Sequence, residues 1–321
     1  MDKVTKIWLI TAASLVLLGC IILGGSLAMS KWDFKSFSTT KYETNTHEIT
    51  EDFQSISINI DTTDVTFAVT DGSKCSVVCY EQKNLTHAVS VKDGVLIIEL
   101  IDSRKWYEHI VIGFETPSIT FYLPRGEYDA LSVSAHTGDI EIPADFAFRS
   151  IDITTSTGEV KNYASALESV KIKATTGNIT VEGLSSDSLE LSVSTGIIKA
   201  SDVTCNGNVT VRVSTGEAYL NNVTCGNISS TGNTGDIFLK NVMANEKLSI
   251  ERSTGNVKLE RCDAAEIFIK TDTGDVKGTL LSDKVFIVRT DTGRISVPDT
   301  VTGGRCEITT DTGNINVSIQ K

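Results

Sequence analysis

The chain has 321 residues, of which 40% are hydrophobic, and its 41 acidic and 29 basic residues give a formal net charge of −12. A chain of this length can hold two domains and bury a large core. The acidic balance argues against a nucleic-acid partner, because binding to phosphates needs a basic surface.

The first predicted element is a transmembrane helix at residues 7–29, which form a run of 23 residues without a charge. Such a run is long enough to cross a bilayer as a helix. The six residues before this run contain two basic residues, Lys3 and Lys6, and one acidic residue, Asp2. Because positive charge favours the cytoplasmic side, residues 1–6 are expected in the cytoplasm and the body of the chain outside the cell membrane, in a single-pass topology.

Two alternatives exist for this segment. A cleaved signal peptide has a shorter apolar core and a small-residue cleavage site, and neither is evident here. The stretch from Leu17 to Cys20 resembles a bacterial lipoprotein processing site, at which Cys20 would be lipidated. The apolar run continues through Leu23, so span length favours an uncleaved anchor.

Residues 30–50 are polar and lack periodicity, which predicts a stalk. Residues 51–125 are predicted to form an irregular N-terminal β cap that includes a first, degenerate coil. Residues 91–95 hold an Asp-Gly pair typical of a hairpin turn. The strand candidates in the cap are residues 75–80, 88–91, 95–100 and 119–123.

From residue 126 to the end the chain is dominated by a Thr-Gly repeat. Successive glycines lie 19 or 20 residues apart, which is the signature of a stacked repeat architecture. The ten repeats have their glycines at Gly138, Gly158, Gly177, Gly196, Gly216, Gly235, Gly255, Gly274, Gly293 and Gly313.

Apolar residues recur seven and five residues before the glycines and two residues after them, with Ser230 as the one polar exception. They alternate with polar residues, as in a strand with one buried face, and Val, Ile and Thr favour strands over helices. The sequence therefore predicts an all-β fold: a parallel β-helix, or β-solenoid, of about ten coils at residues 126–321. Coils stacked about 4.8 Å apart would make a rod roughly 45–50 Å long.

Three acidic residues, Asp272, Asp291 and Asp311, directly precede Thr-Gly in the last three repeats. If consecutive coils stack, their side chains lie side by side, where like charges repel unless a cation intervenes. This arrangement makes them a candidate Ca²⁺ site. The alternative is that the side chains extend into water or cap turn amides, as Asp commonly does. No other cofactor is expected.

Cys205 and Cys225 both lie nine residues after their glycine, so stacking would bring them within disulfide range. The alternative is two small side chains packed in one column. Cys262 and Cys306 fall in apolar columns and are expected in the core. No Cys-x-x-Cys pair occurs, which makes a zinc site improbable.

The four histidines are expected to be exposed or in loops: His47, His87, His109 and His136. None has a serine or cysteine partner in a recognisable nucleophile context. The coils also vary in length by one residue only, so no loop is long enough to wall a catalytic cleft. No catalytic residue is predicted.

The units Ser156–Glu159, Ser214–Glu217 and Asp272–Asp275, behind one membrane segment, resemble the bacterial putative-adhesin family of LiaG-like (DUF4097-type) cell-envelope proteins. The resemblance covers roughly residues 51–321 and implies a β-solenoid outside the membrane, without established catalytic residues.

The leading hypothesis is a non-catalytic adhesin or envelope scaffold, tethered by its N-terminal helix, with cell-wall polymer or an envelope protein as partner. Two alternatives stay open. One is a polysaccharide-active enzyme that uses turn-edge aspartates. The other is an envelope-stress sensor, for which a cytoplasmic tail of about six residues leaves little room.

Overall fold

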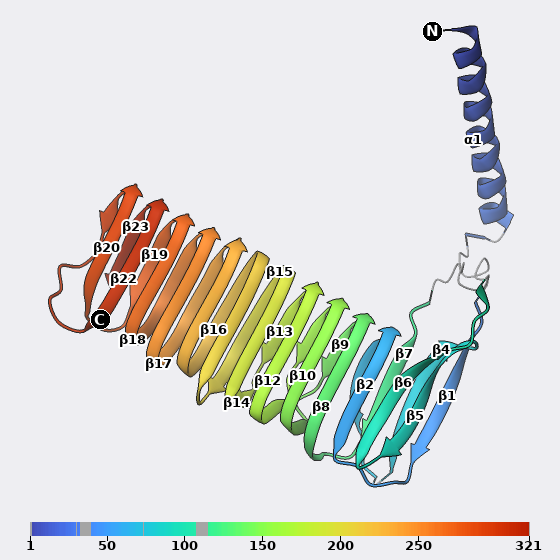
Figure 1. Ribbon diagram of the computed structural model, residues 1–321, viewed down its shortest axis with the longest axis horizontal. Helices are drawn as coiled ribbons and strands as arrows, with labels where there is room; N and C mark the ends of the chain where they lie inside the picture. Colours follow the sequence, from blue (N-terminus) through green and yellow to red (C-terminus); the bar gives the residue numbers. More distant parts are fainter. Residues whose placement is uncertain (1, 30, 33–39, 73, 107–114, 321) are drawn as a thin grey trace.

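The computed structural model describes residues 2–29, 31–32, 40–72, 74–106 and 115–320. It contains one N-terminal helix and a long rod of stacked strands (Figure 1). The rod is a β-solenoid of about ten turns, so the predicted fold class is confirmed. His109 and residues 33–39 of the predicted stalk lie outside the described residues.

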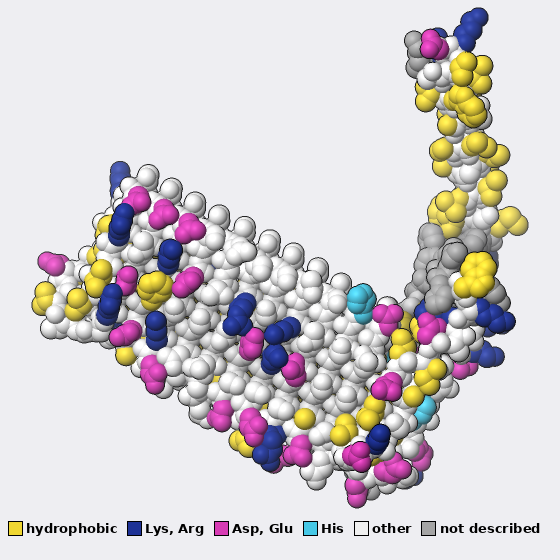
Figure 2. Space-filling model, in the orientation of Figure 1, with side chains coloured by type: hydrophobic (Ala, Val, Ile, Leu, Met, Phe, Trp, Pro, Cys, Tyr) yellow, Lys and Arg dark blue, Asp and Glu magenta, His cyan; other side chains and the backbone are white. Residues whose placement is uncertain are grey.

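Helix α1 (Lys3–Met29) contains the whole predicted span and begins four residues earlier. None of its side chains is buried by the rest of the chain. Hydrophobic side chains cover it on the face shown in Figure 2. It is the one helix among the described residues that is long and apolar enough to cross a membrane.

One coil, residues 188–205, shows how the sequence builds the rod. Its first arm runs to the Thr-Gly turn at Gly196, a second arm follows, and Asp202 then turns the chain with a φ of 54° into a third, short arm. The strand therefore continues past the corner at Asp202 as far as Cys205. Seven side chains face the interior and are at most 3% exposed: Leu189, Leu191, Val193, Ile198, Ala200, Val203 and Cys205.

The corner at Asp202 recurs in the following coils with the same left-handed backbone, at Asn222, Asn241 and Arg261. Asn and Asp tolerate this conformation better than most residues. Asn222 Nδ2 donates to Asp202 Oδ1 (2.7 Å), and Asn241 Nδ2 donates to Asn222 Oδ1 (2.9 Å). Side-chain amides thus tie successive corners together.

The strands of the central coils pair in parallel, with equivalent residues of neighbouring coils aligned. They are β8 (Gly126–Thr137), β9 (Ile140–Ile142), β10 (Phe146–Thr157), β11 (Val160–Asn162), β12 (Ser165–Thr176), β13 (Ile179–Glu182), β14 (Ser185–Ser186), β15 (Ser188–Cys205), β16 (Asn208–Thr234), β17 (Ile237–Thr254), β18 (Val257–Thr273) and β19 (Val276–Leu280).

The glycine of each Thr-Gly pair lies directly against the backbone of a neighbouring coil. Gly177 N–H donates to the Thr195 carbonyl of the next coil (3.0 Å), and equivalent bonds recur along the rod. A Cβ on Gly216 would overlap the Gly196 carbonyl oxygen, and φ at Gly216 is 131°. Close approach and positive φ together require glycine here.

The N-terminal end of the rod is formed by strands β1 to β7. Their bounds are β1 (Tyr42–Ile49), β2 (Ser55–Thr62), β3 (Asp64–Val69), β4 (Cys75–Gln82), β5 (Leu85–Lys92), β6 (Val95–Asp102) and β7 (Ser118–Leu123). All four strands predicted in the cap are present, and the turn between β5 and β6 has positive φ at Asp93 and Gly94, as a tight hairpin requires.

Two expectations for this end are corrected. Residues 42–49, assigned to the stalk, form β1 and pair antiparallel with β4. The cap is also more regular than expected, because β6 and β7 pair in parallel with β2 and β3 and make a further coil outside the first one. Antiparallel β4 and β5 then cover that coil.

The C-terminal end departs from sequence order. Its strands are β20 (Lys284–Thr292), β21 (Ile295–Ser296), β22 (Gly304–Thr312) and β23 (Ile315–Ile319). β22 pairs with both β18 and β20, so the last coil in sequence lies between the two that precede it (Figure 1). Sequence order alone would place the final strand, β23, at the free edge of the stack. Instead β23 lies between β19 and β21. Ile295, on the outer coil, is 45% exposed.

We expect Gly216→Ala to destabilise the protein by more than about 2 kcal/mol, because the added methyl group overlaps the Gly196 carbonyl and φ is positive. Gly126→Ala is the matched control, since a Cβ there meets nothing within 4 Å. Urea unfolding followed by circular dichroism measures both. Equal unfolding midpoints for the two variants would contradict the role of the glycine.

Cysteine cross-linking tests the order of the last coils. Lys270 is aligned with Thr309, and Thr309 with Arg289, so Lys270 and Arg289 are two coils apart. Adjacent coils are within disulfide range and alternate coils are not. We expect Lys270→Cys/Thr309→Cys to form a disulfide upon oxidation and Lys270→Cys/Arg289→Cys to remain reduced, as judged by mass spectrometry of peptides. The opposite result would restore sequence order.

Candidate functional site

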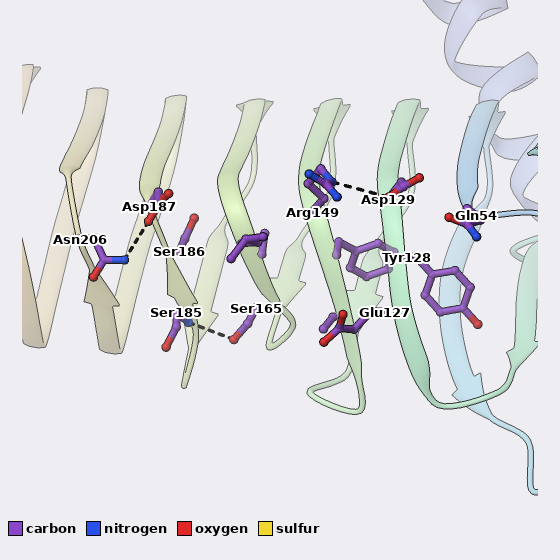
Figure 3. Close-up of a pocket in the computed structure, with 14 residues that line it drawn as sticks. Gln54, Glu127, Tyr128, Asp129, Arg149, Ser165, Ser185, Ser186, Asp187 and Asn206 are labelled. Atoms are coloured by element: carbon purple, nitrogen blue, oxygen red, sulfur yellow. Dashed lines mark hydrogen bonds and ion pairs between the residues drawn. The ribbon is translucent and has the colours of Figure 1, made fainter.

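An open groove of about 470 Å³ crosses the first coils of the rod (Figure 3). Its walls come from residues that lie nine to twelve positions before the glycines of five coils, together with Gln54. These residues are at the corners where one coil passes into the next. Because successive coils are about 4.8 Å apart, the groove extends over roughly 20–25 Å.

The floor of the groove is aromatic and aliphatic. Ten residues before successive glycines lie Tyr128, Phe148 and Leu167, which line the groove on adjacent coils. The Tyr128 and Phe148 rings are 5.7 Å apart, and Phe53 stacks on Tyr128 from the other side at 6.1 Å. Phe148 is buried, whereas Leu167 is 67% exposed and gives the groove an apolar rim.

The Tyr128 hydroxyl donates to the Pro124 carbonyl (2.9 Å), and burial raises the pKa of Tyr128 to about 12. This tyrosine therefore stays protonated and its ring stays fixed over the aromatic floor. Its role is to shape the groove, because a phenol with this pKa is a poor proton donor or acceptor near neutral pH.

Charged and polar side chains surround this floor. Arg149 lies between two acids, with its Nη1 3.3 Å from Glu168 Oε1 and its Nε 3.6 Å from Asp129 Oδ1. Farther along, Asn206 Nδ2 donates to Asp187 Oδ1 (2.8 Å). Figure 3 shows Arg149 directed toward Asp129 and Asn206 toward Asp187.

This arrangement is suited to binding. Glu127, Asp129 and Asp187, the carboxylates that line the groove, are all exposed. A carboxyl group that acts as a general acid near neutral pH needs a desolvated setting that raises its pKa. The groove instead offers apolar contact with hydroxyl, amide and charged groups at its rim, which is typical of a ligand site.

Sequence reasoning missed this groove, although a signal was present. The residue ten positions before the glycine is apolar in three consecutive repeats, at Tyr128, Phe148 and Leu167, and polar at Ser186 and Asn206. In the structure Phe148 is aligned with Ala166, and Leu167 lies in a bulge beside it. The earlier columns were identified by recurrence in nearly every repeat, so a column limited to three repeats did not stand out.

The structure places the predicted calcium residues in adjacent coils, but in the order Asp272, Asp311, Asp291. All three are exposed. Asp291 Oδ1 accepts from Arg289 Nη2 (2.9 Å), which neutralises part of its charge. Among the described residues, the ligand atoms of these three acids do not form a group within 4.8 Å. Calcium binding here stays a prediction.

The acidic residue after the glycine has a defined structural role. Asp275 Oδ1 accepts the backbone N–H of Asn314 in the adjacent coil (2.7 Å), and Asp236 Oδ1 does the same for Asn256 (2.7 Å). The bond to Asn314, followed by the Lys277 ammonium group, lowers the pKa of Asp275 below its usual 3.8. The capping alternative considered for turn aspartates therefore describes these residues.

Cys205 and Cys225 occupy equivalent positions in adjacent coils and are buried free thiols. Burial, followed by the nearby Cys205 thiol, raises the pKa of Cys225 to about 12. A disulfide between them stays a prediction. Cys262 and Cys306 are fully buried, as expected for core residues.

The histidine expectation is wrong for His87, which is 5% exposed and lies in a strand. Its Nδ1 is 2.7 Å from Glu81 Oε2. His136, by contrast, is exposed. No local sequence pattern identifies the His87–Glu81 pair, because the partner lies on another strand.

A family model for Toastrack DUF4097 matches residues 53–212 and 202–321, which together span the rod. The chain belongs to this family. None of the curated proteins matches this Toastrack chain.

Two solved structures are similar to the Toastrack chain. One, described as a putative adhesin from Parabacteroides distasonis, has 16% identity and a TM-score of 0.52, over 75% of this chain and 97% of that one. The other, described as a putative adhesin from Parabacteroides merdae, has 13% identity and a TM-score of 0.49, over 88% and 97% of the two chains. The similarity to the Parabacteroides distasonis structure supports the Toastrack fold.

The lowered pKa of Asp275 predicts a pH dependence of Toastrack stability. A carboxylate with a depressed folded pKa stabilises the fold above its unfolded pKa, and this contribution is lost as the pH falls through the folded value. We expect Asp275→Ala to lower the free energy of unfolding by about 1 kcal/mol at pH 7. The difference from the parent should shrink as the pH falls below the usual aspartate pKa of 3.8 and through the lower folded value.

Urea unfolding at a series of pH values measures this effect. Asp272→Ala is the matched control, since Asp272 is a turn residue two positions before the same glycine and is exposed. A pH-independent difference between Asp275→Ala and the parent would contradict the assignment.

Proposed function

We propose that this protein is a non-catalytic binding module of the cell envelope, tethered by helix α1, which holds an extended ligand in the groove over its first coils. The observation that carries the proposal is the groove itself, with Leu167 67% exposed at its rim and aromatic rings beneath. An exposed apolar surface bordered by polar groups marks an interaction site.

The charge of the protein and of the groove limits the ligand. The formal net charge is −12, and the groove is lined by Glu127, Asp129 and Asp187 against one cation, Arg149. A polyanion would be repelled by this surface. A neutral or amine-bearing segment of cell-wall polymer, or an extended segment of an envelope protein, fits the combination of apolar floor and polar rim.

The membrane tether is supported by α1, which has no charged residue from Ile7 to Met29 and carries Lys3 and Lys6 at its N-terminal end. With the N-terminus in the cytoplasm, the rod would extend from the outer face of the membrane toward the wall. The description of a protein with the same fold as a putative adhesin accords with a surface that binds.

The exposure of the groove carboxylates favours binding over the alternative of a polysaccharide-active enzyme. Glycoside hydrolysis by a carboxyl pair requires one member with a raised pKa. The described turn-edge aspartates are exposed as well, and Asp291 is paired with Arg289.

Co-sedimentation of the full-length protein in detergent with insoluble cell-wall material tests the proposal. We expect Leu167→Asp to weaken binding at least tenfold, because an apolar contact worth about 1.5–3 kcal/mol is replaced by a charge. Val301→Asp is the control, since Val301 is 85% exposed and lies outside the groove.

Equal binding of the Leu167→Asp and Val301→Asp variants would exclude the groove as the site. Absence of sedimentation of the parent protein with wall material, and with membranes that carry envelope proteins, would contradict the proposed function as a whole.

A further inference from the structure

Three side chains with metal-binding atoms meet inside the N-terminal end of the rod. Cys79 and Glu81 lie two residues apart on β4, so both face inward, and His87 lies on β5. One ligand atom from each lies within 4.8 Å of the other two. All three residues are buried, with exposures of 0%, 1% and 5%. In the described part of the chain, this is the one such group.

The fold creates this meeting point because β4 and β5 are joined by a tight turn, with Gln82 aligned with Leu85. β4 pairs with β1 and β7, whereas β5 pairs with β6. The two strands thus lie on different sides of the rod interior, and their inward side chains meet across it. The cluster spans the two layers of the cap.

The polar groups of the cluster are only partly satisfied. Glu81 Oε2 accepts the backbone N–H of His87 (2.7 Å) and contacts His87 Nδ1 (2.7 Å). Glu81 Oε1 accepts from Asn45 Nδ2 (2.7 Å). The other ring nitrogen, His87 Nε2, is buried and has no hydrogen-bond partner among the described residues. A buried imidazole with an unused nitrogen is costly unless something binds it.

The donor set indicates which metal would fit. A cysteine sulfur, an imidazole nitrogen and a carboxylate oxygen are the ligands of Zn²⁺, whereas Ca²⁺ and Mg²⁺ take oxygen alone. At zinc bond lengths of about 2.0–2.3 Å, ligand atoms lie roughly 3.5 Å apart. Glu81 Oε2 and His87 Nδ1, at 2.7 Å, are closer than two ligands of one metal ion, so metal binding requires the Glu81 and His87 side chains to rotate and break this contact.

We propose that Cys79, Glu81 and His87 form a Zn²⁺ site that fastens β4 to β5 inside the N-terminal cap. The role is structural, because the site is buried and a bound metal would stabilise the folded state by mass action. Binding requires the Cys79 thiol to lose its proton to solvent as the metal–sulfur bond forms. The sequence contains no Cys-x-x-Cys pair, which argues against a zinc site built within one strand or turn. The site proposed here is of another kind, because its ligands come from two strands.

Cobalt substitution tests the proposal on the full-length protein in detergent after removal of metal by a chelator. We expect one equivalent of Co²⁺ to give the intense visible absorption of a tetrahedral site together with a sulfur-to-cobalt charge-transfer band. One equivalent of Zn²⁺ should abolish both signals and raise the thermal unfolding midpoint.

Cys79→Ser should lose the charge-transfer band, and His87→Gln should bind Co²⁺ at least tenfold more weakly. Cys306→Ser is the control, because Cys306 is a fully buried cysteine at the opposite end of the rod. Circular dichroism confirms that each variant is folded.

A folded, unmutated protein that gives no cobalt spectrum would overturn the proposal, and the cluster would then be a buried contact between Glu81 and His87 beside a thiol. A charge-transfer band that persists in Cys79→Ser or disappears in Cys306→Ser would overturn it equally. Neither result depends on wall binding, so the groove proposal is tested separately.

Discussion

The structure depends on the direct contact between backbones at the Thr-Gly turn. There the glycine N–H donates to the threonine carbonyl of the neighbouring coil, and no Cβ can be accommodated. This contact sets the register of each coil against the next at one edge. Every other position then aligns in turn, because a parallel ladder carries the alignment along the strand. The apolar columns, the capping aspartates and the corner asparagines all follow from it.

A stack of parallel coils leaves an open strand edge at each end, which invites aggregation. The protein treats both ends in a similar way, by placing a coil out of sequence order. β6 and β7 lie outside β2 and β3, and β20 and β21 lie outside β22 and β23. The last strand of the chain is thereby held between two neighbours. At the N-terminal end, antiparallel β1, β4 and β5 add a further cover.

The features that suggest function are concentrated in the N-terminal part of the rod, where the repeat is least regular. The groove is lined by Tyr128, Phe148 and Leu167 on its first coils and by Ser186 and Asn206 on the later ones, and Leu167 is exposed at a bulge in β12. The Cys79–Glu81–His87 cluster lies in the cap that precedes these coils. The later, more uniform coils supply length, and the irregular early coils supply specific side chains. This division is expected of a solenoid, in which each coil contacts only its neighbours.

Local sequence patterns specify the coil. The regular glycines, the alternating apolar residues, the apolar helix and the Asp93–Gly94 hairpin are local patterns, and each follows from backbone sterics or from burial of one strand face. Tertiary structure decided the order of the end coils, because similar apolar columns let any coil stack on any other. It also decided the pairing of β1 with β4, the groove across five coils and the meeting of Cys79, Glu81 and His87. These features join residues whose partners lie on other strands, and no local pattern specifies such contacts.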